Sequence, residues 1–145
     1  VIKNVRFIGG GNAIYPRNGE IKVENCTFDN NGDALYFEHE CDNLTVTGCT
    51  FNQKDNQNVI LLRGDVKFTD NIINSGRTVN VVSGSPVVTG NDFNDVRFKV
   101  YGAATATISN NTLTIWRLMV LLTLLRLQIT DLAVQHRLFL MVRLK

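Results

Sequence analysis

Short runs of alternating apolar and polar residues recur along the chain with a period near 21 residues. One run, IKVENCTF, begins at Ile21, and related runs begin at Leu44, Val66, Pro86 and Ala106. Aligned on a large apolar residue, they form a column in steps of 21, 23, 22, 20 and 20: Phe7, Phe28, Phe51, Ile73, Phe93 and Leu113. Such self-similarity indicates a solenoid, because each coil buries its apolar face only against its neighbours.

A second column lies three residues before the first and contains only Gly, Asn and Asp: Asn4, Asn25, Gly48, Asp70, Gly90 and Asn110. These residue types tolerate left-handed backbone conformations. The column therefore predicts a one-residue bend between two short strands in every coil. A third apolar run follows in each repeat, and we find no helical period before residue 115.

Together these columns resemble the right-handed parallel β-helix of the pectate-lyase-like superfamily, over about residues 1–115. The resemblance implies an all-β solenoid of about six coils of 20–23 residues, with three strands per coil and like residues stacked on like. A left-handed β-helix is the alternative. It requires hexapeptide repeats, which the irregular spacing does not provide.

The column after the bend predicts what lies inside the coils: Val5, Cys26, Cys49, Asn71, Asn91 and Asn111. Stacked asparagines can exchange side-chain hydrogen bonds from coil to coil. The stacked Cys26 and Cys49 can pack as buried thiols or form a disulfide. Cys41 falls in an expected loop, and without a CxxC pair we expect no metal site.

Length and charge narrow the class of protein. The 145 residues fit one domain, and residues 1–115 carry ten Lys and Arg against twelve Asp and Glu, which gives a net charge of −2. Without a basic stripe, nucleic acid is not an expected partner. The chain starts inside a repeat without Met, so we interpret it as part of a longer solenoid. The missing signal peptide then says nothing about export, and the resemblance implies an extracellular or cell-surface location.

Composition changes abruptly in residues 116–145, which hold ten Leu and no Gly, Asn or Pro. A transmembrane span is not expected, because the longest uncharged run, Leu118–Leu125, is far shorter than the ~20 residues a bilayer requires. One interpretation is a capping helix. The other is a shifted reading frame: in an alternative frame, Leu118–Met119–Val120 and Leu140–Met141–Val142 both encode Asn, Asp, His or Tyr followed by Gly, 22 residues apart.

One dense polar cluster, EHECD, contains Glu38, His39, Glu40 and Asp42. Arg63 ends the matching strand of the next coil, with Lys54 and Asp55 in the preceding loop. Carboxylates and an imidazole can act as acid and base, and carboxylates can bind Ca²⁺. A solvated loop is the alternative that we favour. We expect no cofactor, with Ca²⁺ relevant only to a lyase.

Two classes of function remain. The first is a structural or glycan-binding module that presents a long face to a polysaccharide. The second is part of a lyase, epimerase or glycoside hydrolase acting on acidic polysaccharide, as the resemblance implies. We favour the module, and a chain that is not itself an enzyme. Outward aromatic residues in a groove would favour glycan binding, whereas paired acids opposite an arginine would favour lyase chemistry. Exposed solenoid ends also predict self-association.

Overall fold

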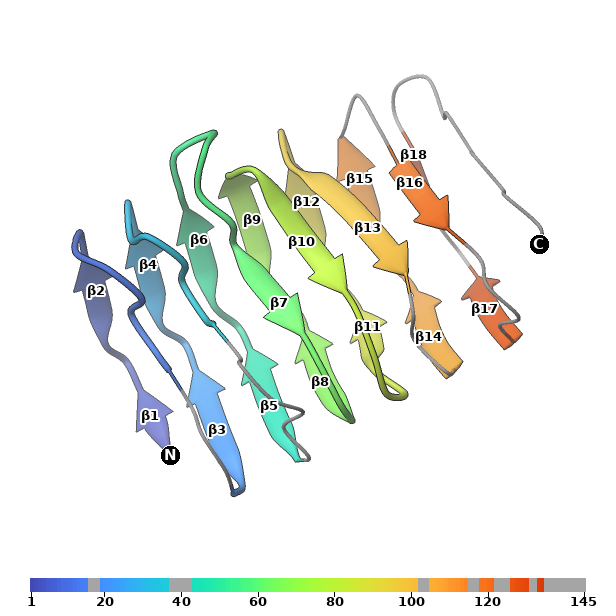
Figure 1. The fold of residues 1–145 in the computed structure, drawn as a ribbon, viewed down its shortest axis with the longest axis horizontal. Helices are drawn as coiled ribbons and strands as arrows, with labels where there is room; N and C mark the ends of the chain where they lie inside the picture. The colour runs from blue at the N-terminus through green and yellow to red at the C-terminus, as the bar shows by residue number, and fades with distance from the viewer. Residues whose placement is uncertain are drawn as a thin grey trace.

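The computed structural model describes residues 1–15, 19–36, 43–101 and 105–114, together with the backbone of 118–121, 126–130 and 133–134. These residues form an all-β parallel solenoid of about five turns, and no helix occurs among them (Figure 1). The fold prediction is thereby confirmed. The turn count is lower than the expected six coils because six successive repeats enclose only five full turns.

Three parallel sheets run along the solenoid axis. The first contains β1 (Ile2–Lys3), β3 (Ile21–Glu24), β5 (Leu44–Thr47), β8 (Val66–Thr69), β11 (Val87–Thr89), β14 (Thr105–Ser109) and β17 (Arg126–Thr130). The second contains β2 (Arg6–Ile8), β4 (Thr27–Asp29), β6 (Thr50–Asn52), β9 (Ile72–Ser75), β12 (Asp92–Asn94), β15 (Thr112–Thr114) and β18 (Ala133–Val134). The third contains β7 (Ile60–Leu62), β10 (Thr78–Val81), β13 (Arg97–Tyr101) and β16 (Leu118–Leu121). Ile14 and Leu35 extend it as single bridges.

Strand register places the large apolar residues in one inward column along the second sheet. Phe28 pairs with Phe51, Phe51 with Ile73, and Ile73 with Phe93. Phe28 and Phe51 stack with ring centroids 4.9 Å apart, and both are fully buried. Phe7 is only partly buried because it lies in the first coil and packs on one side alone.

All six residues of the bend column have φ between 51° and 69°. At Gly48 and Gly90 a Cβ atom would collide with the side-chain oxygen of Asn25 or Asp70 in the preceding coil. The bend between the first and second sheets therefore needs both a left-handed backbone and a compact residue at these two coils.

A directed hydrogen-bond ladder follows the bend inside the solenoid. The backbone N–H groups of Cys49, Asn71 and Asn91 donate to the Oδ1 atoms of Asn71, Asn91 and Asn111, at 2.9, 3.0 and 2.9 Å. Each of these asparagines also donates Nδ2 to a carbonyl of the coil before it. The buried amides are thus satisfied from both sides.

The two cysteines of the same column are free buried thiols, so they do not form the disulfide that the sequence allowed. Cys49 Sγ accepts the N–H of Cys26 at 3.4 Å. Burial raises the pKa of the Cys49 thiol to about 11. Cys41 lies outside the described residues.

The described part of the tail consists of strands, whereas a capping helix was one of the two interpretations of the sequence. β16, β17 and β18 pair in parallel with β13, β14 and β15. Their backbones thus continue the solenoid for a further coil. The shifted-frame interpretation concerns the gene and stays a prediction.

Candidate functional site

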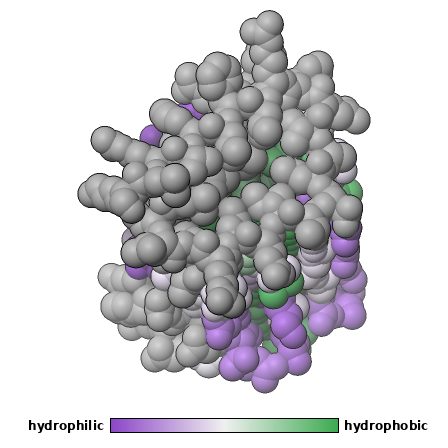
Figure 2. All heavy atoms as spheres, turned by 90° about the vertical axis from the view of Figure 1, so that its right-hand side faces the viewer, coloured by the Kyte–Doolittle hydropathy of each residue, from purple (hydrophilic) through white to green (hydrophobic). Residues whose placement is uncertain are grey.

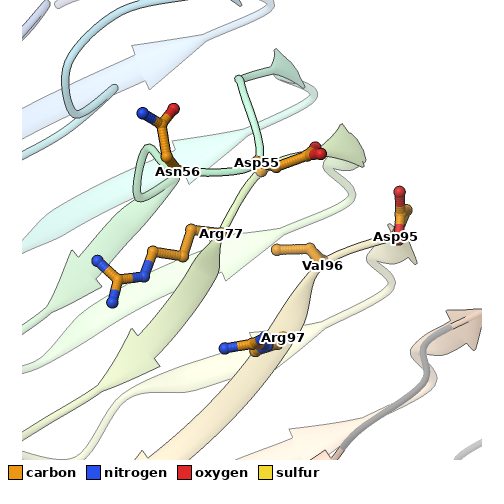
Figure 3. Close-up of a pocket in the computed structure, with 7 residues that line it drawn as sticks. Asp55, Asn56, Arg77, Asp95, Val96 and Arg97 are labelled. Atoms are coloured by element: carbon orange, nitrogen blue, oxygen red, sulfur yellow. The ribbon is translucent and has the colours of Figure 1, made fainter.

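An open groove of about 540 Å³ lies at the corner between the second and third sheets (Figure 3). It is lined by Asp55, Asn56, Gly76, Arg77, Asp95, Val96 and Arg97. Its volume is within the usual range of small-ligand pockets, ~300–1,000 Å³.

Unequal connections between the same two sheets create this groove. Residues 53–59 join β6 to β7 and form a seven-residue loop, here named the groove loop. In the next two coils the corresponding connections are only two residues long, 76–77 and 95–96. The groove loop therefore projects beyond its neighbours and forms one wall, while the short connections form the floor.

Gly76 lets the floor pass beneath the groove loop. Its φ is 147°, and a Cβ atom there would lie 2.5 Å from Val59 Cγ2 and 3.2 Å from Gln53 Cβ. Gln53 and Val59 are the two ends of the groove loop, and both are buried. A side chain at position 76 would thus push the wall away from the floor.

Two arginines on successive coils provide the groove's positive charge. Arg77 precedes β10 and Arg97 begins β13, and the Arg97 N–H donates to the Arg77 carbonyl oxygen at 3.3 Å. Both side chains are exposed. Their guanidinium groups extend to the same side of the groove, whereas the carboxylates of Asp55 and Asp95 point elsewhere (Figure 3).

None of these four charged side chains forms an ion pair within the part of the chain that the structure describes. Ion pairs do occur elsewhere, where Arg6 contacts Asp29 at 2.6 Å and Lys3 contacts Glu24 at 3.0 Å. The guanidinium N–H groups of Arg77 and Arg97 are therefore free to bind carboxylate or hydroxyl oxygens of a ligand.

The predicted EHECD cluster of Glu38, His39, Glu40 and Asp42 lies outside the described residues. Arg63 is half-buried after β7 and is not among the residues that line the groove. Of the loop residues that precede it, Asp55 does line the groove. No cluster of three or more metal-ligating side chains occurs among the described residues.

Sequence reasoning missed Arg77, Asp95 and Arg97 as site residues. They come from separate coils and carry no local motif. The available signal was the length of the segment after Phe51, which exceeds the matching segments of the next two coils.

Two exposed aromatic residues stack on each other directly after the single bridges that extend the third sheet. Tyr15 and Tyr36 have ring centroids 5.6 Å apart, with 16° between the ring planes, and exposed fractions of 39% and 36%. Stacking covers one face of each ring, and neither tyrosine is among the residues that line the groove.

A polar ladder also crosses the outer surface of the second sheet. Asp29 accepts from Arg6 Nε at 2.6 Å and from Asn52 Nδ2 at 2.7 Å, and Asn52 accepts from Asn74 Nδ2 at 2.8 Å. The Asn52 and Arg6 hydrogen bonds lower the pKa of Asp29. Because its members bond to one another, we assign this ladder to stability. In Figure 2, hydrophilic side chains gather along the bottom and lower right of the view, and hydrophobic ones show between them.

Comparison with known proteins identifies the protein family of the chain. The family model described as right handed beta helix region matches residues 1–114. The chain therefore belongs to this right-handed β-helix family, a class that includes structural and carbohydrate-related modules. No match was found among curated proteins or among solved structures.

No described segment is a helix with the length and apolar character needed to cross a membrane.

Proposed function

We propose that the chain is a structural and glycan-binding module of a secreted or cell-surface protein, and that the glycan binds in the groove. The observation that carries this proposal is the pair of unpaired arginines, Arg77 and Arg97, on successive coils of a rigid floor. Guanidinium groups recognise carboxylates bidentately and also donate to hydroxyl oxygens. Asp55, Asn56 and Asp95 add acceptors for sugar hydroxyls.

Exposure of the charged side chains supports binding over catalysis. Catalytic acids and bases are usually placed in a desolvated cleft, and these side chains remain in contact with water. Secretion or surface display belongs to the proposal because the family resemblance implies it.

The test is titration calorimetry of the chain with neutral and uronate-containing oligosaccharides of equal length. Arg77→Gln and Arg97→Gln should each weaken binding about tenfold, since a charge-assisted hydrogen bond is lost. Lys67→Gln is the control. Lys67 is exposed on β8, away from the groove, and its replacement by Gln removes one positive charge, as the arginine substitutions do. Equal losses for Lys67→Gln and Arg97→Gln, or no binding of any oligosaccharide, would contradict the proposal.

A second candidate, lyase or hydrolase chemistry on acidic polysaccharide, draws support from the two carboxylates that share the groove with the arginines. Incubation with a uronate polymer, followed by mass spectrometry of the products, distinguishes it. Under this candidate, shortened chains appear with the parent protein and disappear with Asp95→Asn. Under the binding proposal, the polymer stays intact with both.

A further inference from the structure

The groove loop is held to the next coil by three backbone hydrogen bonds. Gln53 N donates to the Ser75 carbonyl oxygen at 3.2 Å, Arg77 N to the Gln57 carbonyl oxygen at 2.8 Å, and Val59 N to the Thr78 carbonyl oxygen at 2.9 Å. Within the loop, Gln57 N closes a turn onto the Lys54 carbonyl oxygen at 2.9 Å. These bonds fix the base of the loop. Asp55 and Asn56, which line the groove, lie between them.

A chain of side-chain hydrogen bonds fixes the loop from the adjacent strand. Thr78 Oγ1 donates to Asn58 Oδ1 at 2.8 Å, and Asn80 Nδ2 donates to Thr78 Oγ1 at 2.9 Å. Thr78 is only 2% exposed, so water does not compete for its hydroxyl. Since Thr78 has one hydroxyl proton and accepts from Asn80, that proton is committed to Asn58.

Asn58 also lies near Asp33 of the preceding coil. Burial raises the pKa of Asp33, and hydrogen bonding to Asn58 lowers it to a smaller extent. The bond that fixes Asn58 to the following coil is the one it accepts from the Thr78 hydroxyl.

We infer that Asn58 and Thr78 are positioning residues of the groove, which fix the groove loop so that Asp55 and Asn56 line the same groove as Arg77 and Arg97. The effect on a ligand rests on the proposed glycan-binding function. The effect on the loop does not depend on any ligand.

Limited trypsin digestion of the full chain tests the loop directly, because Lys54 is the one trypsin site within residues 53–59. Thr78→Val keeps the branched shape of the side chain and removes the hydroxyl, and Asn58→Ala removes the other partner. Each should speed cleavage after Lys54 about fivefold, the loss expected for one net hydrogen bond when cleavage follows local opening. Hydrogen exchange should show faster exchange of the Gln57 and Val59 amides.

Thr69→Val is the matched control. Thr69 also donates its hydroxyl to a neighbouring coil, to Thr47 Oγ1 at 3.1 Å, but it lies on β8 in the first sheet. This variant should leave cleavage after Lys54 unchanged. Unchanged cleavage and exchange in both Thr78→Val and Asn58→Ala would overturn the inference, as would an equal acceleration by Thr69→Val.

Titration with the oligosaccharides named above separates the two proposals. If the wild type binds none of them and the loop still opens in the variants, the glycan proposal fails and the positioning role stands. If the wild type binds and the variants bind equally well with an unaltered loop, the positioning role fails alone.

Discussion

At the scale of single residues, the bend column shows how residue type determines backbone geometry. From Asn25 to Asn110, a residue with a side-chain oxygen alternates with glycine at positions whose φ values are nearly the same. The asparagine and aspartate side chains extend toward the following coil, where the space above Asn25 and Asp70 is left by Gly48 and Gly90. The column is therefore a complementary pattern of side chains and gaps.

Replacing Gly90 by Val should lower the free energy of unfolding by at least ~1–2 kcal/mol, because a left-handed conformation is costly for a residue with a Cβ atom. The added Cβ also meets Asp70 Oδ1. Urea denaturation followed by circular dichroism measures the change.

Gly11→Val is the control, since a Cβ atom at Gly11 has no neighbour within 4 Å and Gly11 does not have positive φ. It should change stability by no more than ~0.5 kcal/mol. A Gly90→Val chain as stable as Gly11→Val would be inconsistent with a steric requirement at the bend.

At the scale of elements, the strands are too short to be stable alone, and stacked side chains join them. Phe51 stacks on Phe28 with a centroid distance of 4.9 Å and contacts the tilted Phe68 ring at 5.8 Å. β6, which carries Phe51, has three residues. Most of its stability must then come from side-chain contacts between coils rather than from the strand itself.

Phe51→Ala should destabilise the chain by ~3–5 kcal/mol, the usual cost of truncating a buried aromatic residue. Thermal or urea unfolding measures it. Tyr36→Ala provides the comparison, because Tyr36 also stacks on an aromatic residue of the preceding coil but is 36% exposed. Its cost should be clearly smaller, and equal costs would mean that burial does not govern the stack.

Sequence predicted the repeating elements well and the groove poorly, for a physical reason. Positions such as Phe51 and Gly48 face the same surroundings in every coil, so their chemistry recurs and can be recognised. The groove arises where the repeat is broken, at residues 53–59. Arg77 and Arg97 reach it only because short connections in two other coils bring them beside that loop. Their proximity depends on connection lengths in three dimensions.

At the scale of the whole molecule, each coil contacts mainly its two neighbours, and stability should be local. Deleting residues 116–145 removes the strands paired with β13, β14 and β15. Hydrogen exchange should become faster in those three strands and remain unchanged at Val46 and Phe68, which lie several coils away.

The truncated chain should also self-associate more, because its newly exposed edge strands lack partners. Sedimentation velocity of both chains measures this. Loss of protection at Val46 and Phe68 on truncation would show that the tail stabilises the entire solenoid, which a shifted reading frame would not be expected to do.

The hydrogen bonds of the asparagine ladder connect each coil to partners that are synthesised earlier and later in the chain. The N–H groups of Asn71 and Asn91 are completed by oxygens about 20 residues later in the chain, and Asn91 and Asn111 reach back to carbonyls that are already in place. As the chain leaves the ribosome, each newly made coil therefore completes the hydrogen bonds of the coil before it. The most recently made coil lacks the acceptor for its N–H group until the next asparagine emerges. Synthesis and folding can thus advance together, one coil at a time.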